Sequence, residues 1–331
     1  MKAHAPGRVN LIGDHTDYTG GLVLPMAIDR GTTIEGSATE RLEVYLRSDD
    51  EPSAAVVPLD VADPASVEPL WARYIAGVVS VLRPRTGFVG TVRSTLPLGA
   101  GLSSSSSLTV ATALALGFDG SPVELALACQ RAEQTSSGVP GGVMDQLVAA
   151  AGRAGHAILI DCSTLDMTPV ALPGGVDVVV VHSGVRRALV SSAYAERRAQ
   201  CEAAEHALGR LMREATLDDA DQLTDPLLRR RTRHVVSENQ RVRIFADALR
   251  AGDMTTAGKA MYASHASLRD NFDVSTPELD ALVERLRRTP GVWGARLTGA
   301  GFGGCVVALT DPGAAVDGWR VQAADGARVE P

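Results

Sequence analysis

The alternation of apolar and polar residues along positions 86–96, Thr-Gly-Phe-Val-Gly-Thr-Val-Arg-Ser-Thr-Leu, predicts a strand that ends at Pro97. Two continuous apolar runs, at 156–162 and 176–182, predict strands that are buried on both faces. Shorter strands are expected at Leu11-Ile12, at 294–298 and at 304–309.

Apolar residues at helical spacing predict an alanine-rich buried helix over Leu108–Leu116. Three further helices are expected at 122–135, 143–151 and 277–288, and a continuous helical pattern rich in Ala, Arg, Glu and Leu covers 194–251. This mixture of elements indicates an α+β chain, with a boundary after Cys162 and near Pro173.

Composition limits the class of protein. The chain has 331 residues, of which 45% are hydrophobic and 21% are charged, so it can form one large or two ordinary globular domains. A net charge of −7 argues against non-specific nucleic-acid binding, which needs a basic surface. No apolar run approaches the roughly 20 residues that span a bilayer, and the first residues carry no apolar signal segment.

Cysteine and histidine give little support for a metal or disulfide framework. The four cysteines, Cys129, Cys162, Cys201 and Cys305, are widely scattered and form no Cys-x-x-Cys pair. The seven histidines are equally dispersed. We therefore expect free thiols and a cytoplasmic protein.

Residues 99–107, Gly-Ala-Gly-Leu-Ser-Ser-Ser-Ser-Ser, combine the features that a polyphosphate site needs. Gly99 and Gly101 allow close approach of the backbone, and the serines supply hydroxyl groups and an N-cap for the helix that follows. A helix N-terminus directs unpaired N–H groups at an anion. The loop lacks the lysine of a P-loop, and Ser104 occupies the third glycine position of the dinucleotide pattern. The alternative interpretation is a flexible Gly/Ser linker.

A second glycine-bounded segment, residues 6–21, is unusually polar. Its short apolar break at Leu11-Ile12 is followed by residues that suit a sugar site, because carboxylates and a histidine can bind vicinal hydroxyls. The alternative is a solvated turn, which Asp, Thr and Gly also favour. The polar members are Arg8, Asn10, Asp14, His15, Asp17 and Tyr18.

These two segments carry a resemblance to a known family. Residues 6–21 resemble the galactokinase signature of the GHMP kinases, residues 97–107 resemble the phosphate-binding motif of that family, and residues 297–305 resemble its third motif. The motifs stand in the family's order, and weaker similarity covers 132–133, 139–146, 185–201 and 261–282.

The resemblance implies the two-domain GHMP kinase fold. Its N-terminal domain, expected over residues 1–172, is similar to the second domain of ribosomal protein S5. The C-terminal domain, expected over 173–331, is ferredoxin-like, and the active site lies between the two. The implied activity is ATP-dependent phosphorylation of the C1 hydroxyl of a monosaccharide, with galactose as the first candidate and with Mg²⁺ as the metal.

The resemblance also implies a role for individual residues. Asp145 matches the base that accepts the sugar hydroxyl proton, and Arg8 matches the arginine that stabilises the transferring phosphoryl group. Ser105 and Glu133 match the Mg²⁺ ligands, although a neighbouring serine could substitute for Ser105. Sugar contacts are implied for Asp14, His15, Asp17 and Tyr194. ATP contacts are implied for Gly99, Ala100, Gly101, Leu102, Ser103, Ser104 and Ser105.

Position 14 departs from the family pattern. Asp14 stands where these kinases usually have Glu, and the shorter side chain keeps open a different small sugar, such as an amino sugar or a pentose. A second alternative is a catalytically inactive sugar sensor. In each case the expected partners are a small sugar and ATP, with no nucleic acid and no membrane, and the expected state is a monomer.

Overall fold

The computed structural model describes residues 1–97, 99–139, 141–185 and 190–330. Its largest sheet has six strands in the order β13-β1-β3-β6-β4-β5 and is antiparallel except for the parallel pair β4–β6. The strands are β1 (Lys2–Asn10), β3 (Pro25–Thr39), β4 (Glu43–Ser48), β5 (Ala55–Pro58), β6 (Gly87–Ser94) and β13 (Arg328–Glu330).

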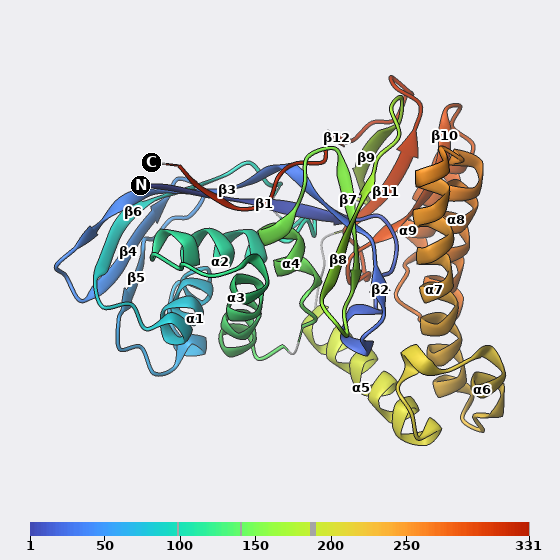
Figure 1. Cartoon of the computed structure of the whole chain (residues 1–331), viewed down its shortest axis with the longest axis horizontal. Helices are drawn as coiled ribbons and strands as arrows, with labels where there is room; N and C mark the ends of the chain where they lie inside the picture. The colour runs from blue at the N-terminus through green and yellow to red at the C-terminus, as the bar shows by residue number, and fades with distance from the viewer. Residues whose placement is uncertain (98, 140, 186–189, 331) are drawn as a thin grey trace.

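Four helices cover one face of this sheet (Figure 1). They are α1 (Ala72–Leu82), α2 (Ser104–Ala115), α3 (Pro122–Ser137) and α4 (Met144–Ala151). Ser107 ties α2 to the sheet, because its Oγ donates to the Ala5 carbonyl (2.7 Å) and accepts from the Thr32 amide (2.9 Å). The start of α2 is thereby fixed beside β1, which carries Arg8.

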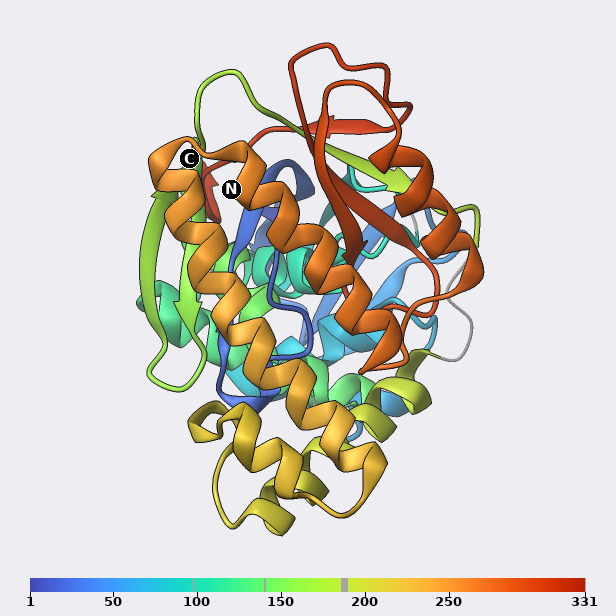
Figure 2. The same ribbon diagram turned by 90° about the vertical axis from the view of Figure 1, so that its right-hand side faces the viewer.

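The second half of the chain forms an antiparallel sheet in the order β10-β11-β9-β12. Its strands are β9 (Asp177–His182), β10 (Val292–Thr298), β11 (Cys305–Thr310) and β12 (Trp319–Val321). Long helices pack on it, as Figure 2 shows. They are α7 (Pro226–Ala251), α8 (Met254–Asp270) and α9 (Pro277–Arg287), with α5 (Val190–Leu208), η3 (Met212–Glu214) and α6 (Leu217–Gln222) at one end.

Two features connect the halves. A small sheet of the first half pairs β2 (Leu22–Val23) with β7 (His156–Asp161) and β8 (Asp166–Ala171), and its strands β2 and β8 contact α7 of the second half. The C-terminal strand β13 returns to the first sheet and pairs with β1, so both ends of the chain lie side by side (Figure 1). The chain thus crosses between the halves again after β12, and the boundary at residue 173 stays a prediction.

Most predicted elements are confirmed. The strand at 86–96 is β6, and the two apolar runs at 156–162 and 176–182 are β7 and β9. The helices expected at 122–135, 143–151 and 277–288 are α3, α4 and α9. The glycine turn 299–304 joins β10 to β11, as predicted. The α+β class is therefore correct.

Two expectations are wrong in detail. The helical pattern of 194–251 is broken into α5, η3, α6 and α7, because Thr216 and Asp225 cap new helices and Pro226 begins the last one. The strand expected at Leu11-Ile12 ends at Asn10 instead. Both residues are nevertheless fully buried, and the Leu11 amide donates to the Leu24 carbonyl (3.1 Å).

Within the described residues, none of the helices combines the length and the apolar character that crossing a bilayer requires.

Candidate active site

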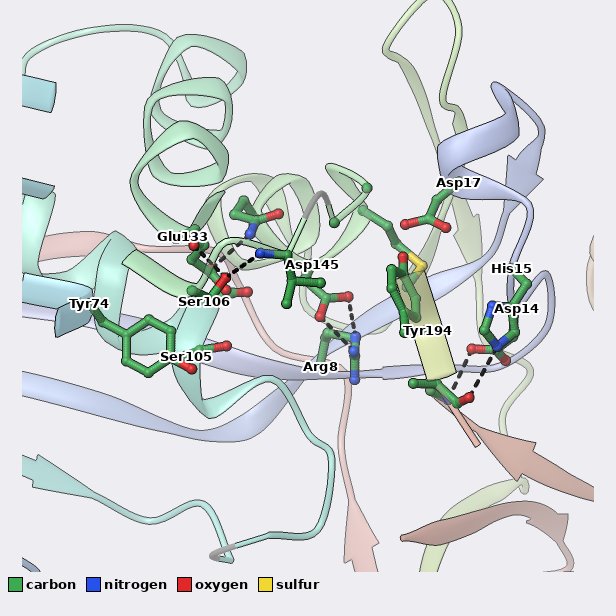
Figure 3. A pocket seen from close by; sticks show the side chains of 18 residues that line it. Arg8, Asp14, His15, Asp17, Tyr74, Ser105, Ser106, Glu133, Asp145 and Tyr194 are labelled. Carbon is green, nitrogen blue, oxygen red and sulfur yellow. Dashed lines mark hydrogen bonds and ion pairs between the residues drawn. The ribbon is translucent and has the colours of Figure 1, made fainter. Parts of the chain in front are cut away.

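A cavity of about 460 Å³ lies where the two halves meet. The glycine turn after β10, the start of α4, the end of β1 and the loop that follows β1 all contribute to its wall. Figure 3 shows Arg8 and Asp145 near its middle, with Glu133, Ser105 and Tyr74 on one side and Asp17 and His15 on the other. The predicted site residues that line it are Arg8, Asp14, His15, Asp17, Ser105, Glu133, Asp145 and Tyr194.

The central contact is a two-pronged ion pair. The Arg8 Nε donates to Asp145 Oδ1 and its Nη2 donates to Oδ2, both at 2.6 Å. The third nitrogen of Arg8 donates to the Gly101 carbonyl (2.8 Å), and the Ser103 hydroxyl donates to Asp145. Such a planar fork fixes the orientation of both groups. Arg8, Asp145 and the glycine loop are thereby held as one unit.

The loop from Gly99 to Ser105 turns sharply into α2. Gly99, Gly101 and Ser103 have positive φ angles of 71°, 74° and 58°. Ser103 occupies the N-cap position without a side-chain capping bond, since its hydroxyl is directed to Asp145. The other loop residues with a predicted ATP contact lie in two places. Ala100 and Leu102 are buried in the core, whereas Ser104 and Ser105 line a neighbouring cavity.

Glu133 lies on α3 beside the start of α2. Its Oε1 accepts from the Gln146 amide (2.7 Å) and from the Thr109 hydroxyl (3.2 Å). Burial raises the pKa of Glu133, and the charge of Asp145 adds to this rise, while hydrogen bonds from Ser106 and Gln146 oppose it. Among the described residues, nothing hydrogen-bonds Gln146 Oε1, which is buried at the cavity wall.

Asp17 is the carboxylate on the other side. Burial raises its pKa to about 7, and the nearby Asp145 charge contributes to the shift. Burial also raises the pKa of the Tyr194 hydroxyl well above its ordinary value. Both side chains line the cavity, where they can exchange hydrogen bonds with a polyhydroxyl ligand.

His15 has both ring nitrogens engaged. Its Nε2 donates to the Ala300 carbonyl (3.1 Å), since a carbonyl can only accept, and in the neutral ring its Nδ1 accepts from the Tyr18 hydroxyl (2.9 Å). The ring also packs against Phe272 and Tyr194, with centroid distances of 4.8 and 5.7 Å. His15 thus presents a ring held in one tautomer.

The Asp14 side chain is bonded to residues of the C-terminal half of the chain. Its carboxylate forms an ion pair with Arg296 of β10 and accepts from the Gly299 amide (2.9 Å). Arg296 is fully buried and Asp14 is 3% exposed, so this pair is shielded from water. The predicted sugar contact of Asp14 stays a prediction, because a carboxylate so engaged has little freedom to turn toward the cavity.

A second cavity, of about 430 Å³, adjoins the first and shares Tyr74 and Ser105 with it. Its apolar wall is made by Leu70, Trp71 and Leu108. An aromatic and aliphatic pocket beside the 99–105 loop is suited to a planar ring.

The chain is similar to known proteins over nearly its whole length. Three family descriptions match the chain: the galactokinase galactose-binding signature at residues 1–38, the N-terminal domain of GHMP kinases at 73–153 and the C-terminal domain of GHMP kinases at 245–320. The galactokinase of Homo sapiens is 44% identical over 361 residues, which cover 99% of this chain and 92% of that protein. The chain belongs to the galactokinase family of GHMP kinases.

Other galactokinases match nearly the whole chain at 33–45% identity. That of Roseiflexus sp. strain RS-1 is 45% identical over 93% of this chain and 82% of its own length. The crystal structure of Lactococcus lactis galactokinase complexed with galactose superposes with a TM-score of 0.90 at 33% identity, covering 99% of this chain and 94% of that one. Methanococcus jannaschii mevalonate kinase shares the fold, with a TM-score of 0.70 at 21% identity over 98% of each chain.

Two residues that contact the predicted site residues were not predicted from the sequence. Gln146 hydrogen-bonds Glu133, and Arg296 pairs with Asp14. Ser106, which also hydrogen-bonds Glu133, is one of the serines expected to be able to replace Ser105. Gln146 could have been found from its place directly after Asp145. Arg296 could not, because an arginine within an apolar strand gives no indication of its partner 282 residues away.

Proposed function

We propose that this chain transfers the γ-phosphoryl group of ATP to the C1 hydroxyl of galactose. The observation that carries the proposal is the Arg8–Asp145 fork at the middle of one cavity. One side of the cavity offers Asp17 and Tyr194 to a sugar, and the other offers the serine loop and Glu133 to phosphates (Figure 3). Membership of the galactokinase family supports galactose as the sugar.

Asp145 is the proposed base. The C1 hydroxyl gives its proton to Asp145 as its oxygen bonds to the γ-phosphorus, and the bond from that phosphorus to the bridging oxygen of ADP breaks. Arg8 is bonded to Asp145 and to the Gly101 carbonyl of the glycine loop, so it lies between the proposed base and the proposed phosphate site. There it offsets the negative charge on the phosphoryl group that is transferred. Phosphoryl transfer depends mainly on positioning the reacting groups and neutralising their charge. The fixed side chains of Asp145 and Arg8 can provide both.

Ser105 and Glu133 are the proposed protein ligands of Mg²⁺, which neutralises phosphate charge when bound. Mg²⁺ usually takes one or two protein oxygens and completes its shell with phosphates and waters. Burial raises the pKa of Glu133, and within the described residues the buried Gln146 Oε1 has no hydrogen-bond partner, so both groups fit a place where a bound cation would be favourable.

The cavity beside Trp71 and Tyr74 is the proposed site of the adenine ring. We further propose that the protein is a cytoplasmic monomer whose partners are a sugar and ATP, without nucleic acid or membrane. The net charge of −7 supports the absence of nucleic acid.

A coupled ATP/Mg²⁺ assay over galactose, glucose, N-acetylgalactosamine, arabinose, homoserine and mevalonate tests the proposal. We expect turnover to be fastest with galactose. Turnover of only another sugar would retain the mechanism and reject galactose. ATP binding without turnover of any compound would reject the kinase activity and favour a sugar sensor.

A further inference from the structure

The loop from Leu11 to Leu22 carries Asp14, His15 and Asp17, and one helix of the other half holds its backbone. The Gly13 amide donates to Glu238 Oε1 (3.0 Å), and the Leu22 amide donates to Asn239 Oδ1 (2.7 Å). The Asp14 carbonyl accepts from His234 Nε2 (3.1 Å). All three side chains belong to α7.

All three contact the loop, but from two parts of the α7 surface. Positions 234 and 238 are four residues apart and share one face, whereas Asn239 lies about 100° further round the helix and bonds the Leu22 end of the loop. His234 and Glu238 are fully buried, and Asn239 is nearly so. A long helix that buries a histidine, a glutamate and an asparagine together desolvates all three, and only specific partners can offset that cost.

Glu238 is the most completely bonded of the three. Besides the Gly13 amide, its Oε1 accepts from the Ser264 hydroxyl (2.6 Å), and its Oε2 accepts from Arg241 Nε (2.7 Å). Burial alone would raise the pKa of Glu238, but Arg241 and the other neighbours lower it to about 2. Glu238 is therefore an ionised carboxylate held in place by its neighbours, and its Oε1 accepts the hydrogen bond from the loop at Gly13.

His234 is held in one form as well. Since the Asp14 carbonyl can only accept, His234 Nε2 donates and its Nδ1 accepts from the Ser267 hydroxyl (3.0 Å). Burial lowers the pKa of His234 to about 4, so the ring stays neutral. On the loop side, a Cβ built on Gly21 would lie 2.6 Å from Asn239 Oδ1, so the loop backbone lies directly on the helix.

We propose that Glu238, with His234 and Asn239, is a positioning residue for the sugar half of the active site. It acts through the backbone of residues 13–22 and fixes the place of Asp17. The proposed ATP and Mg²⁺ groups stand instead on α2 and α3 and in the 99–105 loop. Loss of the Glu238 contact therefore weakens sugar binding and leaves nucleotide binding intact. This inference rests on the proposed sugar kinase function.

The test compares Glu238→Gln with Asp247→Asn. The control makes the same change of carboxylate to amide on the same helix, at an exposed position. In Glu238→Gln the amide cannot satisfy Gly13, Ser264 and Arg241 together, so we expect the KM and Kd for galactose to rise about tenfold. The KM for ATP and the kcat at saturating sugar are expected to stay within about twofold of the wild type, as are all constants of Asp247→Asn.

Hydrogen exchange of the ligand-free protein separates this inference from the proposed function. Faster exchange of residues 11–22 in Glu238→Gln, with the rest of the chain unchanged, is expected whatever the substrate. Unchanged exchange, or an equal rise in the KM for sugar and for ATP, would overturn the inference. If the wild type phosphorylates no sugar, the proposed function is wrong, and hydrogen exchange of residues 11–22 alone then tests whether Glu238 positions the loop. If Glu238→Gln does not fold, Asn239→Ala removes the neighbouring contact and is judged by the same two measurements.

Discussion

Asp17 fills the space that a side chain at position 142 would need: a Cβ built on Gly142 would lie 1.8 Å from Asp17 Oδ2. The two residues come from different parts of the chain, the loop after β1 and the segment just before α4. The glycine is therefore required by close approach to the carboxylate that faces the cavity. Asp17 and Tyr194 both line the cavity, so this close approach lies at the wall of the proposed sugar site.

Gly142→Ala is expected to push Asp17 aside and to raise the KM for galactose about tenfold or more, because small displacements of substrate-binding groups are costly. The KM for ATP should be unchanged. Gly174→Ala is the control, since a Cβ at this exposed position meets nothing within 4 Å and Gly174 does not line the cavity. Steady-state kinetics of both variants are the measurement. Equal KM values for galactose in the two variants would show that the position of Asp17 does not affect sugar binding.

Sugar binding should depend on pH through Asp17, whose pKa is raised to about 7. A raised pKa means that the carboxylate is protonated as the pH falls through about 7, and the protonated form accepts fewer hydrogen bonds from sugar hydroxyls. We expect the Kd for galactose to rise about tenfold from pH 8 to pH 6. Calorimetry over this range is the measurement, and Asp17→Asn should bind weakly with a flat profile. An equally steep profile in Asp17→Asn would assign the titration to another group.

Asp145→Asn is expected to lower kcat by about 10²- to 10⁴-fold, the usual contribution of a general base. Asparagine keeps an acceptor for Arg8 but cannot take up the hydroxyl proton. Binding of ATP, measured by calorimetry, should be retained because the glycine loop keeps its other contacts with Arg8. A near-normal kcat would reject Asp145 as the base.

Glu133→Gln is expected to raise the Mg²⁺ concentration for half-maximal activity about tenfold, because a neutral amide is a weaker ligand than a carboxylate. The exposed Glu202→Gln on α5 serves as the control. Activity and Mg²⁺-dependent nucleotide binding are titrated with Mg²⁺ for both. An unchanged midpoint in Glu133→Gln would remove this residue from the metal site.

The strands β9 and β11 and the helix α3 were predictable because their signals are local. Continuous apolar runs mark the two strands, and Ser121 with Pro122 marks the start of the helix. Helix α8 was not predicted, although Asp253 caps its start and Met254, Ala257, Met261 and Leu268 are buried at helical spacing. Gly258 and the polar Ser264, which are also buried on this helix, interrupt the apolar pattern and weaken that signal.

The sequence was sufficient to predict which residues belong to the site, but not which of them contact one another. Arg8 and Asp145 are 137 residues apart, and only the family resemblance indicated that they act together. No pattern in the sequence shows that Ser103 donates to Asp145 instead of capping α2. Such partners are fixed by tertiary packing, which the order of residues along the chain does not display.

The buried pair of Asp14 and Arg296 gives the clearest stability prediction. Asp14→Asn leaves the Arg296 guanidinium buried without its counter-ion, which should lower the free energy of unfolding by about 3–5 kcal/mol. Asp14→Glu forces an extra methylene into the same site and should cost about 1–3 kcal/mol. Urea unfolding measures both. Asp177→Asn breaks a partly exposed pair with Arg320 and should cost at most about 1 kcal/mol. An equally mild effect of Asp14→Asn would mean that Asp14 is free to turn toward the sugar.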